Sequence, residues 1–345
     1  MPNVFSELSR LLMAGSEAVL TTIVTPAGTE RRLAAGEGAP AAPWPEAGSL
    51  VTERTQERTV IVERFAPRPR LVVFGGGHIA LALVPMAATM DFLTTVYDDR
   101  PSFSSPARFP AAQAAICESF GAIGQNLALG PGDFVVITTR GHRHDEDCLR
   151  FVLGGPEPLY VGMIGSRRRV ATVRDRLSAV GFPEARLARL CSPIGLPIGA
   201  VTPPEIAVSI LAQIVQKRRE AEKAAGRGHL ETFPDQALLR RLASGDREGL
   251  ALVTVVAAKG STPRRAGAKM AVFFDGRSLG SIGGGCAEAG VIARARPAIG
   301  TGGHLLYRVD LSGSAEEDGM VCGGWMEVLV EDWPGTARHF FERSR

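Results

Sequence analysis

Apolar residues along the chain fall into short runs separated by glycine- and proline-bearing turns, which is typical of an α/β protein. LVVF at residues 71–74 predicts a buried parallel strand, and FLTTVYD, which ends at Asp98, predicts a second. Further strands are predicted at 134–139 and 159–164, each ending in a polar or glycine-bearing loop of the kind that holds ligands in doubly wound folds. The pattern therefore predicts a Rossmann-like, doubly wound parallel sheet over residues 67–225.

A glycine-rich turn follows the first of these strands and leads into a helix. Gly75, Gly77 and Ala80 fit the pattern G-x-G-x-x-A, His78 begins the predicted helix, and Asp98 ends the next strand about twenty residues later. Such glycines let a backbone approach a pyrophosphate at a helix N-terminus, and an acid at the position of Asp98 holds ribose hydroxyls, with NAD preferred over NADP. We therefore expect a nucleotide site. A Rossmann-like unit that serves only as a scaffold is the alternative, since a fold does not fix a function.

The loop after the third strand is rich in residue types that bind metals. Their spacing matches no firm metal-site template, and the segment continues directly into an amphipathic helix. We favour an acidic helix N-terminus beside ligand-facing histidines over a metal site. The residues concerned are His142, His144, Asp145, Asp147 and Cys148.

The loop after the fourth strand begins a basic helix. Gly165 and Ser166 are predicted to open that helix, and Arg167 is the first of three arginines in its first turn. Amide groups and arginines at a helix N-terminus suit a phosphate or another anion. A solvated basic helix face is an equally weighted alternative.

The last part of the chain, residues 237–345, alternates strands with glycine turns. The predicted order is strand, glycine–proline loop, strand, turn, short strand, glycine turn and helix, with VCGGWMEVLVE returning as a strand. Cys286 ends the run GGGC at the start of the helix, where the helix dipole lowers the pKa of a thiol. Cys322 lies beside two glycines at the entry of the returning strand. We favour thiolates suited to soft metals and sulfur chemistry over two small apolar side chains, and the spacing leaves a disulfide open.

The first part, residues 1–66, resembles the last part in its pattern. ELSRLLMAGSEAVLTTIVTPAGTERRL is similar to LLRRLASGDREGLALVTVVAAKGSTPRR, and TVIVERFAP is similar to MEVLVEDWP. Between these ends the first copy is shorter, rich in Ala, Gly and Pro, and has neither GGGC nor CGG. We interpret residues 1–66 as a degenerate copy of the cysteine-bearing domain, with 226–236 as a linker before the intact copy. Chance similarity between helix–strand pairs is the alternative.

Bulk composition narrows the functional classes. The chain has 345 residues, enough for two or three domains. Its net charge of +3 is too small to indicate a nucleic-acid or anionic-membrane partner. No apolar run approaches the ~20 residues that span a bilayer, and we expect no signal peptide. Five cysteines, an odd and sparse set, favour free thiols in a reducing cytoplasm.

In combination these motifs resemble one known family. STPRRAGAKM, GSIGGGCAEA and VCGGWMEVLVE are similar to the cysteine-bearing domain of the XdhC/CoxI family; FGGGHIALAL, YDDRP, TTRGHRHDEDCL, VGMIGSRRR and SPIGLPIGAVTPPEIAVSILAQI are similar to its Rossmann domain. The resemblance covers most of residues 59–334. This sequence departs from the family in domain order, because family members carry the cysteine domain first, and in GGGC where many relatives have SGGC. Exchange between the two chains of a homodimer is one way to restore the usual contact.

Family members are maturation factors of xanthine dehydrogenase and related molybdenum hydroxylases. The resemblance implies that this chain binds molybdenum cofactor (molybdopterin), supports its sulfuration together with a cysteine desulfurase, and passes it to the apoenzyme. Nothing in the sequence requires chemical turnover, so we expect an accessory protein in place of an enzyme. The alternative is an NAD(P)-dependent oxidoreductase built on the Rossmann domain, for which His142 and His144 are the candidate proton donors.

The resemblance also implies a set of cofactor contacts. Cys286 is expected to touch the molybdenum centre or to pass sulfur through it, with Cys322 on the opposite wall. Lys269 and Arg264 or Arg265 are expected to meet the cofactor's phosphate. The Rossmann domain is expected to hold the pterin or nucleotide end, or a separate NAD(P)- or ATP-like ligand. The expected contacts are Gly283, Gly284, Gly285, Cys286, Glu288, Cys322, Gly323, Gly324, Lys269, Arg264, Gly75, Gly77, His78, Asp98, Gly165, Ser166 and Arg167.

Overall fold

The computed structural model describes residues 3–35, 50–224, 235–246, 248–311, 323–333 and 338–341. The chain divides into two compact units. Unit 2 is the continuous segment Arg68–Ala225, whereas unit 1 combines the two ends of the chain, Met1–Pro67 and Gly226–Arg345. The sequence did not predict that the two ends fold together. Across the described ranges, no helix combines the length and the apolar character that crossing a membrane requires.

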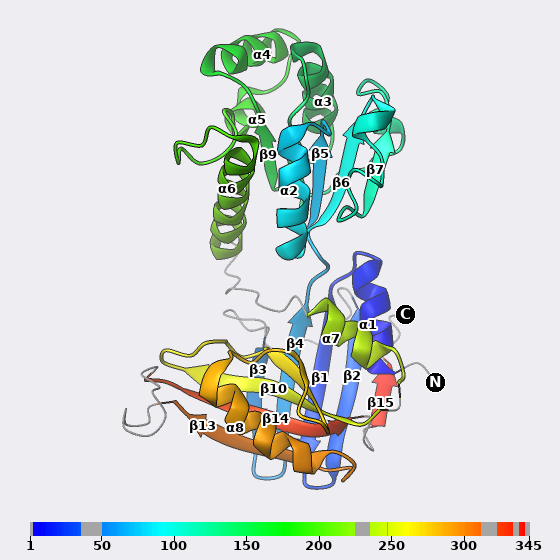
Figure 1. Ribbon diagram of the computed structural model, residues 1–345, viewed down its shortest axis with the longest axis vertical. Coiled ribbons are helices and arrows are strands. Elements are labelled where there is room, and N and C mark those ends of the chain that lie inside the picture. The colour runs from blue at the N-terminus through cyan, green and yellow to red at the C-terminus, as the bar shows by residue number, and fades with distance from the viewer. Residues whose placement is uncertain are drawn as a thin grey trace. The chain divides into compact units, whose positions relative to one another are not determined.

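Unit 2 is built on a five-stranded parallel sheet (Figure 1, cyan to green). The strand order is β7-β6-β5-β8-β9, and every neighbouring pair is parallel. The strands are β5 (Arg70–Phe74), β6 (Leu93–Asp98), β7 (Ala114–Cys117), β8 (Phe134–Ile137) and β9 (Tyr160–Met163). This sheet confirms the Rossmann-like fold that the sequence predicted.

Helices cover both faces of the parallel sheet, which explains why its strands read as continuous apolar runs. Leu71 and Val73 of β5 pack on one face with α2 (His78–Thr89) and α6 (Pro203–Ala224). Val72 and Phe74 pack on the other face with the remaining helices of the unit. These are α3 (His142–Gly154), α4 (Arg167–Ala179) and α5 (Glu184–Ala188).

The C-terminal half of unit 1 contains an antiparallel sheet, hereafter sheet C, with the strand order β12-β11-β10-β14-β13. A short helix, α7 (Gln236–Ala243), precedes it, and α8 (Gly285–Ala295) covers its outer face through Ala287, Val291 and Ala295. The element order agrees with the prediction. The strands are β10 (Leu250–Lys259), β11 (Lys269–Phe273), β12 (Ser278–Gly280), β13 (His304–Asp310) and β14 (Trp325–Trp333).

The N-terminal part of unit 1 forms a second five-stranded sheet, hereafter sheet A, with the order β15-β2-β1-β4-β3. Helix α1 (Val4–Met13) precedes it, and the final strand β15 (Arg338–Phe341) joins its edge in parallel with β2. The other pairs are antiparallel. The strands are β1 (Ala18–Thr25), β2 (Gly28–Ala35), β3 (Leu50–Arg54) and β4 (Thr59–Phe65).

The two sheets of unit 1 share one core. Leu20 of sheet A and Leu252 of sheet C belong to the same buried cluster, together with apolar residues of α1 and α7. The helices are also linked by a hydrogen bond of 2.8 Å from Asn3 Nδ2 to the carbonyl oxygen of Leu242. Removing either half of unit 1 would therefore expose a large apolar surface.

Candidate cofactor site

The glycine run before Cys286 forms the turn between β12 and α8. Gly283, Gly284 and Gly285 have φ angles of 137°, 74° and 68°, a region that L side chains rarely adopt. A Cβ on Gly283 would lie 2.6 Å from the Cβ of Pro263, whereas one on Gly284 or Gly285 would meet nothing within 4 Å. The turn therefore requires glycine, and one side of it leaves the backbone open. Because α8 begins at Gly285, Cys286 lies in its first turn, as the sequence predicted.

Glu288 holds this turn in shape from the start of α8. Its Oε2 accepts hydrogen bonds from Ser281 Oγ (2.8 Å) and from the backbone N–H groups of Gly284 (2.9 Å) and Ile282 (3.3 Å). A carboxylate at this end of a helix also interacts favourably with the helix dipole. Glu288 was expected to contact the cofactor. In the structure one oxygen of its carboxylate binds the turn, and its contact with the cofactor stays a prediction.

The loop Gly260–Arg265, which follows β10, brings the motifs of unit 1 together. Its Pro263 packs on the glycine turn, as described above. A Cβ on Gly324, just before β14, would lie 2.6 Å from the carbonyl oxygen of Ser261 and 2.7 Å from that of Lys259. Such close approach explains why glycine is needed there. The segments that carry the STPRR, GGGC and CGG motifs are therefore neighbours in space.

The structure describes the two cysteines of this unit in part. For Cys286 it describes the backbone, and Cys322 lies outside the described residues. Gly323, which follows Cys322, has a φ of 63°, and a Cβ there would meet no described residue within 4 Å apart from its chain neighbours. Cofactor contact by this pair stays a prediction, and the disulfide that the sequence left open is not tested by the described residues.

The two basic residues expected at the cofactor phosphate lie in different places. Arg264 is exposed, and its backbone nitrogen lies 3.5 Å from the position that a Cβ on Gly283 would take. Lys269 is buried between the two sheets, where its Nζ lies 2.7 Å from Glu63 Oε1 and 3.1 Å from Thr254 Oγ1. The assignment of Lys269 to the phosphate is therefore corrected, since its charge is already paired inside unit 1.

In unit 2, Asp98 closes the glycine loop that follows β5. It is buried, and its carboxylate accepts hydrogen bonds from the amides of Gly76 (2.8 Å) and Arg100 (3.0 Å) and from the Arg100 guanidinium at 2.8 and 3.0 Å. Burial by itself raises the pKa of Asp98, but these hydrogen bonds and the charge of Arg100 outweigh burial and lower it. With its oxygens taken, Asp98 does not offer the contact to ribose hydroxyls that the sequence suggested.

The glycines of the same loop differ in how open they are. A Cβ on Gly75 would lie 2.4 Å from the carbonyl oxygen of Thr138, and one on Gly76 would lie 1.8 Å from that of Phe103. Gly77, the residue before α2, has open space, and His78 is exposed beside it. Only this last part of the loop offers backbone to a ligand.

Two arginines that the sequence analysis passed over shape this loop. Arg100 binds Asp98, and Arg108 donates a hydrogen bond of 3.0 Å from Nε to the carbonyl oxygen of Gly76. The signal for Arg100 was present in YDDRP, where an arginine follows the acid by two residues. Arg108 lies in an irregular segment with no motif that marks it.

The loops after β8 and β9 are tied together by a buried acid. Asp145 accepts a hydrogen bond of 2.6 Å from Thr139 Oγ1 and pairs with Arg169. Burial raises the pKa of Asp145, and the Thr139 hydroxyl and the Arg169 charge offset this in part. Ser166 caps α4, because its Oγ accepts a hydrogen bond of 3.3 Å from the Arg169 amide.

The basic segment Gly165–Ser166–Arg167 lies at the start of α4, as expected, and the structure describes only the backbone of Arg167. The histidine-rich segment forms the start of α3. Cys148 is buried in the core of unit 2, and burial raises the pKa of its thiol. Within the described ranges, no three His, Cys, Asp or Glu side chains gather as a metal site.

Comparison with known proteins connects both glycine-rich sites to one family. Residues 71–214 match the XdhC Rossmann domain, and residues 243–310 match the XdhC and CoxI family. The chain is 36% identical over 164 residues to an uncharacterized protein, YqeB, of Escherichia coli (strain K12), covering 47% of this chain and 30% of that protein. It is 31% identical over 186 residues to a protein of Bacillus subtilis (strain 168) named as a probable xanthine dehydrogenase subunit, covering 51% of this chain and 54% of that protein.

The chain therefore spans well under two thirds of the length of these two curated relatives. A solved structure from Bacillus halodurans, described as a xanthine dehydrogenase, is 28% identical with a TM-score of 0.52 and covers 68% of this chain and 69% of that one. The matched segments contain the loops of unit 2 and the GGGC turn of unit 1. The chain thus belongs to the XdhC and CoxI family, with its Rossmann domain preceding the domain that carries GGGC.

Proposed function

We propose that this protein is an accessory factor in the maturation of a xanthine dehydrogenase-type molybdenum hydroxylase and that it carries molybdenum cofactor as its cargo. One observation supports this proposal above the others. The STPRR loop packs on the GGGC turn at the start of α8 through Pro263, and it also packs on Gly324 through Ser261. One loop thus contacts both cysteine-bearing segments, and the glycine turn leaves backbone open beside Cys286.

The residues at this place fit the chemistry of the cargo. Among the described residues, no atom other than the chain neighbours and the helix backbone lies within 4 Å of the Cβ positions at Gly284 and Gly285, which suits the approach of a ligand to this backbone. A cysteine in the first turn of a helix suits a soft metal or its sulfur ligands. Arg264, exposed beside the turn, suits a phosphate. We assign Cys286 to the metal or its sulfur, Arg264 to the phosphate, and Cys322 and Gly323 to the facing wall. Gly324, also expected there from the sequence, is buried against Ser261 and Lys259.

Unit 2 is proposed to hold a separate ligand of its own, a nucleotide other than NAD(P). Its accessible residues are Gly77 and His78 at the start of α2 and the segment Gly165–Arg167 at the start of α4. Both places are helix N-termini that follow parallel strands, where doubly wound folds place ligands. The group expected at these helix N-termini is the phosphate of that nucleotide.

The proposed partners follow from the cargo. A xanthine dehydrogenase-type apoenzyme receives the cofactor, and a cysteine desulfurase supplies the sulfur. We retain a homodimer as part of the proposal, formed through a surface other than the sheet-to-sheet contact of unit 1.

An NAD(P)-dependent oxidoreductase is the less supported function. Its main support from the sequence was Asp98, and that carboxylate is bound to Gly76 and Arg100. A dinucleotide held through ribose hydroxyls would have to displace the Arg100 side chain. Titration with NADH, followed by nicotinamide fluorescence, is expected to show no saturable binding.

A maturation assay tests the accessory role. A xanthine dehydrogenase-type hydroxylase would be produced in cells that lack their own maturation factor, with no partner, with this protein, or with its Cys286→Ser or Cys117→Ser variant. Cys117 is exposed at the end of β7 and serves as the matched control. We expect hydroxylase activity with the wild type and with Cys117→Ser, and activity near the level without partner for Cys286→Ser. Equal activity in all four preparations would count against the proposal.

A further inference from the structure

Four strands of each sheet in unit 1 have the same topology, and only the edge strands β15 and β12 differ. In sheet A, β1 pairs with β2 and β4, and β3 pairs with β4; in sheet C, β10 pairs with β11 and β14, and β13 pairs with β14. All these pairs are antiparallel. A helix precedes the first strand in both cases, α1 for sheet A and α7 for sheet C. These four strands and the helix before them thus correspond one to one, as in a duplicated fold.

The strand registers extend this correspondence to single residues. Leu20 lies opposite Glu63 in sheet A, and Leu252 lies opposite Glu331 in sheet C. Hence Glu63 and Glu331 occupy equivalent positions.

The basic residues correspond in the same way. Thr22 lies opposite Arg31, and Thr254 lies opposite Lys269. Arg31 and Lys269 are therefore equivalent, and each copy presents one acid and one base at matching places.

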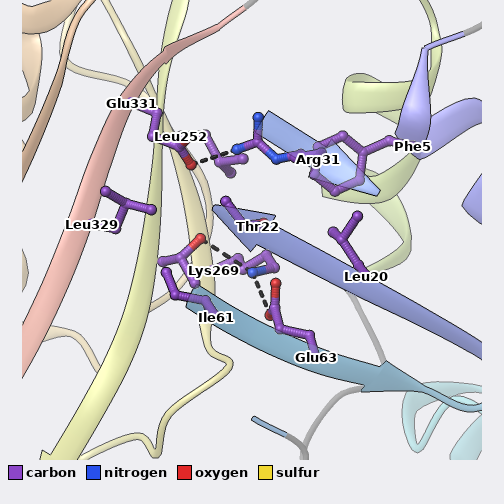
Figure 2. A pocket seen from close by; sticks show the side chains of 11 residues that line it. Phe5, Leu20, Thr22, Arg31, Ile61, Glu63, Leu252, Lys269, Leu329 and Glu331 are labelled. Carbon is purple, nitrogen blue, oxygen red and sulfur yellow. Dashed lines mark hydrogen bonds and ion pairs between the residues drawn. The ribbon is translucent and has the colours of Figure 1, made fainter. Parts of the chain in front are cut away.

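These equivalent residues pair across the two sheets and not within them (Figure 2). Arg31 of sheet A binds Glu331 of sheet C at 2.5 Å, and Lys269 of sheet C binds Glu63 of sheet A at 2.7 Å. No more than 8% of any of the four side chains is exposed. In a two-fold contact, residue i of one copy meets residue j of the other while j meets i, and the two ion pairs follow this rule.

We infer that the inner face of sheet C is a docking surface for a second copy of the same fold, and that residues 1–67 occupy it as a built-in second copy. Unit 1 is then a pseudo-dimer within one chain. The N-terminal copy supplies the complementary face, while the sequence of that copy carries no GGGC run. Each chain accordingly contains one glycine–cysteine turn per pair of sheets. This inference is independent of the cargo proposed above.

The reciprocity of the ion pairs gives a direct test. Variant N carries Arg31→Glu and Glu63→Arg, both in sheet A. Each cross-sheet pair then joins two like charges, with an acid facing Glu331 and a base facing Lys269. Variant C carries Lys269→Glu and Glu331→Arg, both in sheet C, and it also joins two like charges in each cross-sheet pair. A quadruple variant with all four substitutions restores opposite charges within one chain. Charges that are buried without a partner are strongly destabilising, so variants N and C are expected to melt roughly 10 °C or more below the wild type, and the quadruple variant closer to it.

Co-refolding of variants N and C then distinguishes a docking surface from an ordinary core. If the sheets exchange, the N-terminal sheet of each variant meets the C-terminal sheet of the other, and all four pairs become complementary. We expect a heterodimer of twice the chain mass by light scattering, which neither variant forms alone. Failure of the quadruple variant to recover stability would overturn the reciprocal pairing. Recovery in that variant without any heterodimer in the mixture would overturn the docking surface.

Discussion

Lys269 of β11 and Glu63 of β4 form an ion pair between the two sheets of unit 1, with 2.7 Å between Nζ and Oε1. The two residues are 206 positions apart in sequence, and 8% and 3% of their side chains are exposed. The pair joins the N-terminal segment to the domain that carries GGGC. It also explains why a lysine next to the STPRR motif is not available to a ligand.

Breaking this pair is expected to destabilise unit 1. Lys269→Met removes the cation and leaves Glu63 buried without its partner, which costs about 3–5 kcal/mol of unfolding free energy. Adding Glu63→Leu removes the second charge and is expected to recover much of that loss. Urea unfolding of the wild type, both single variants and the double variant measures the coupling. Arg277→Ala, which breaks a well-exposed pair with Asp275, is the control and is expected to change stability much less, because water screens an exposed pair. Additive effects of the two single substitutions would contradict the pairing.

Gly283 is expected to tolerate no side chain. Gly283→Ala places a Cβ 2.6 Å from Pro263 Cβ at a φ of 137°, which combines a clash with backbone strain of about 1–3 kcal/mol. Gly290→Ala is the matched control in α8, where a Cβ meets nothing within 4 Å, and it is expected to stabilise by about 0.5–1 kcal/mol. Thermal unfolding compares the two variants. Equal midpoints for both would show that the turn is more adaptable than its geometry indicates.

Glu288 is expected to act through the shape of the turn. Glu288→Ala leaves the amides of Ile282 and Gly284 without their acceptor, a cost of about 1–3 kcal/mol for buried donors, and is expected to reduce molybdenum retention. Glu288→Gln keeps an acceptor oxygen and is expected to retain most of the cofactor. Molybdenum content after anaerobic loading and gel filtration measures both variants. If Glu288→Gln loses as much cofactor as Glu288→Ala, the carboxylate charge has a role beyond shaping the turn.

The contribution of Asp98 to stability is expected to depend on pH. Its pKa in the folded protein lies below the ordinary value of 3.8, because hydrogen bonds from Arg100 and the amides outweigh burial. A lowered pKa means that the ionised group stabilises the fold above pH 3.8, and that this contribution is lost as pH falls through the folded value.

Urea unfolding of the wild type and Asp98→Asn over a pH series measures this effect. The wild type is expected to be more stable near pH 7, and the difference is expected to shrink below pH 3.8. Asp175→Asn, at an exposed position of α4, is the control. A difference that grows toward acid pH would contradict the arrangement around Asp98.

Much of each sheet could be predicted from local sequence. The run LVVF indicated β5, and the glycines after it indicated the start of α2. The succession of β10, β11, β12 and α8 also followed from apolar runs between glycine turns. These elements could be predicted because the spacing of apolar residues, the turn residues and the residues that begin helices are all local properties of the sequence.

The partners of the charged side chains could not be predicted in this way. From the sequence, Lys269 looks like an exposed base beside a loop. In the structure it is buried, because sheet A, which carries Glu63 near the other end of the chain, packs over it. Asp98 fits a ribose-binding pattern in the sequence. In the structure the chain after β6 places the Arg100 guanidinium against the Asp98 carboxylate, where it donates two hydrogen bonds. In both cases a tertiary contact determines the surroundings of the charged side chain. The residues next to it in sequence do not indicate that contact.

The central claim is that the GGGC turn holds molybdenum cofactor through Cys286, and cofactor retention tests it most directly. Wild type, Cys286→Ser and Cys117→Ser would be incubated anaerobically with molybdenum cofactor, separated by gel filtration and analysed for molybdenum. We predict that molybdenum co-elutes with the wild type and with Cys117→Ser and is lost from Cys286→Ser, while all three elute at the same volume. Equal molybdenum in the wild type and Cys286→Ser, or none in the wild type where a known carrier protein retains it, would contradict the claim.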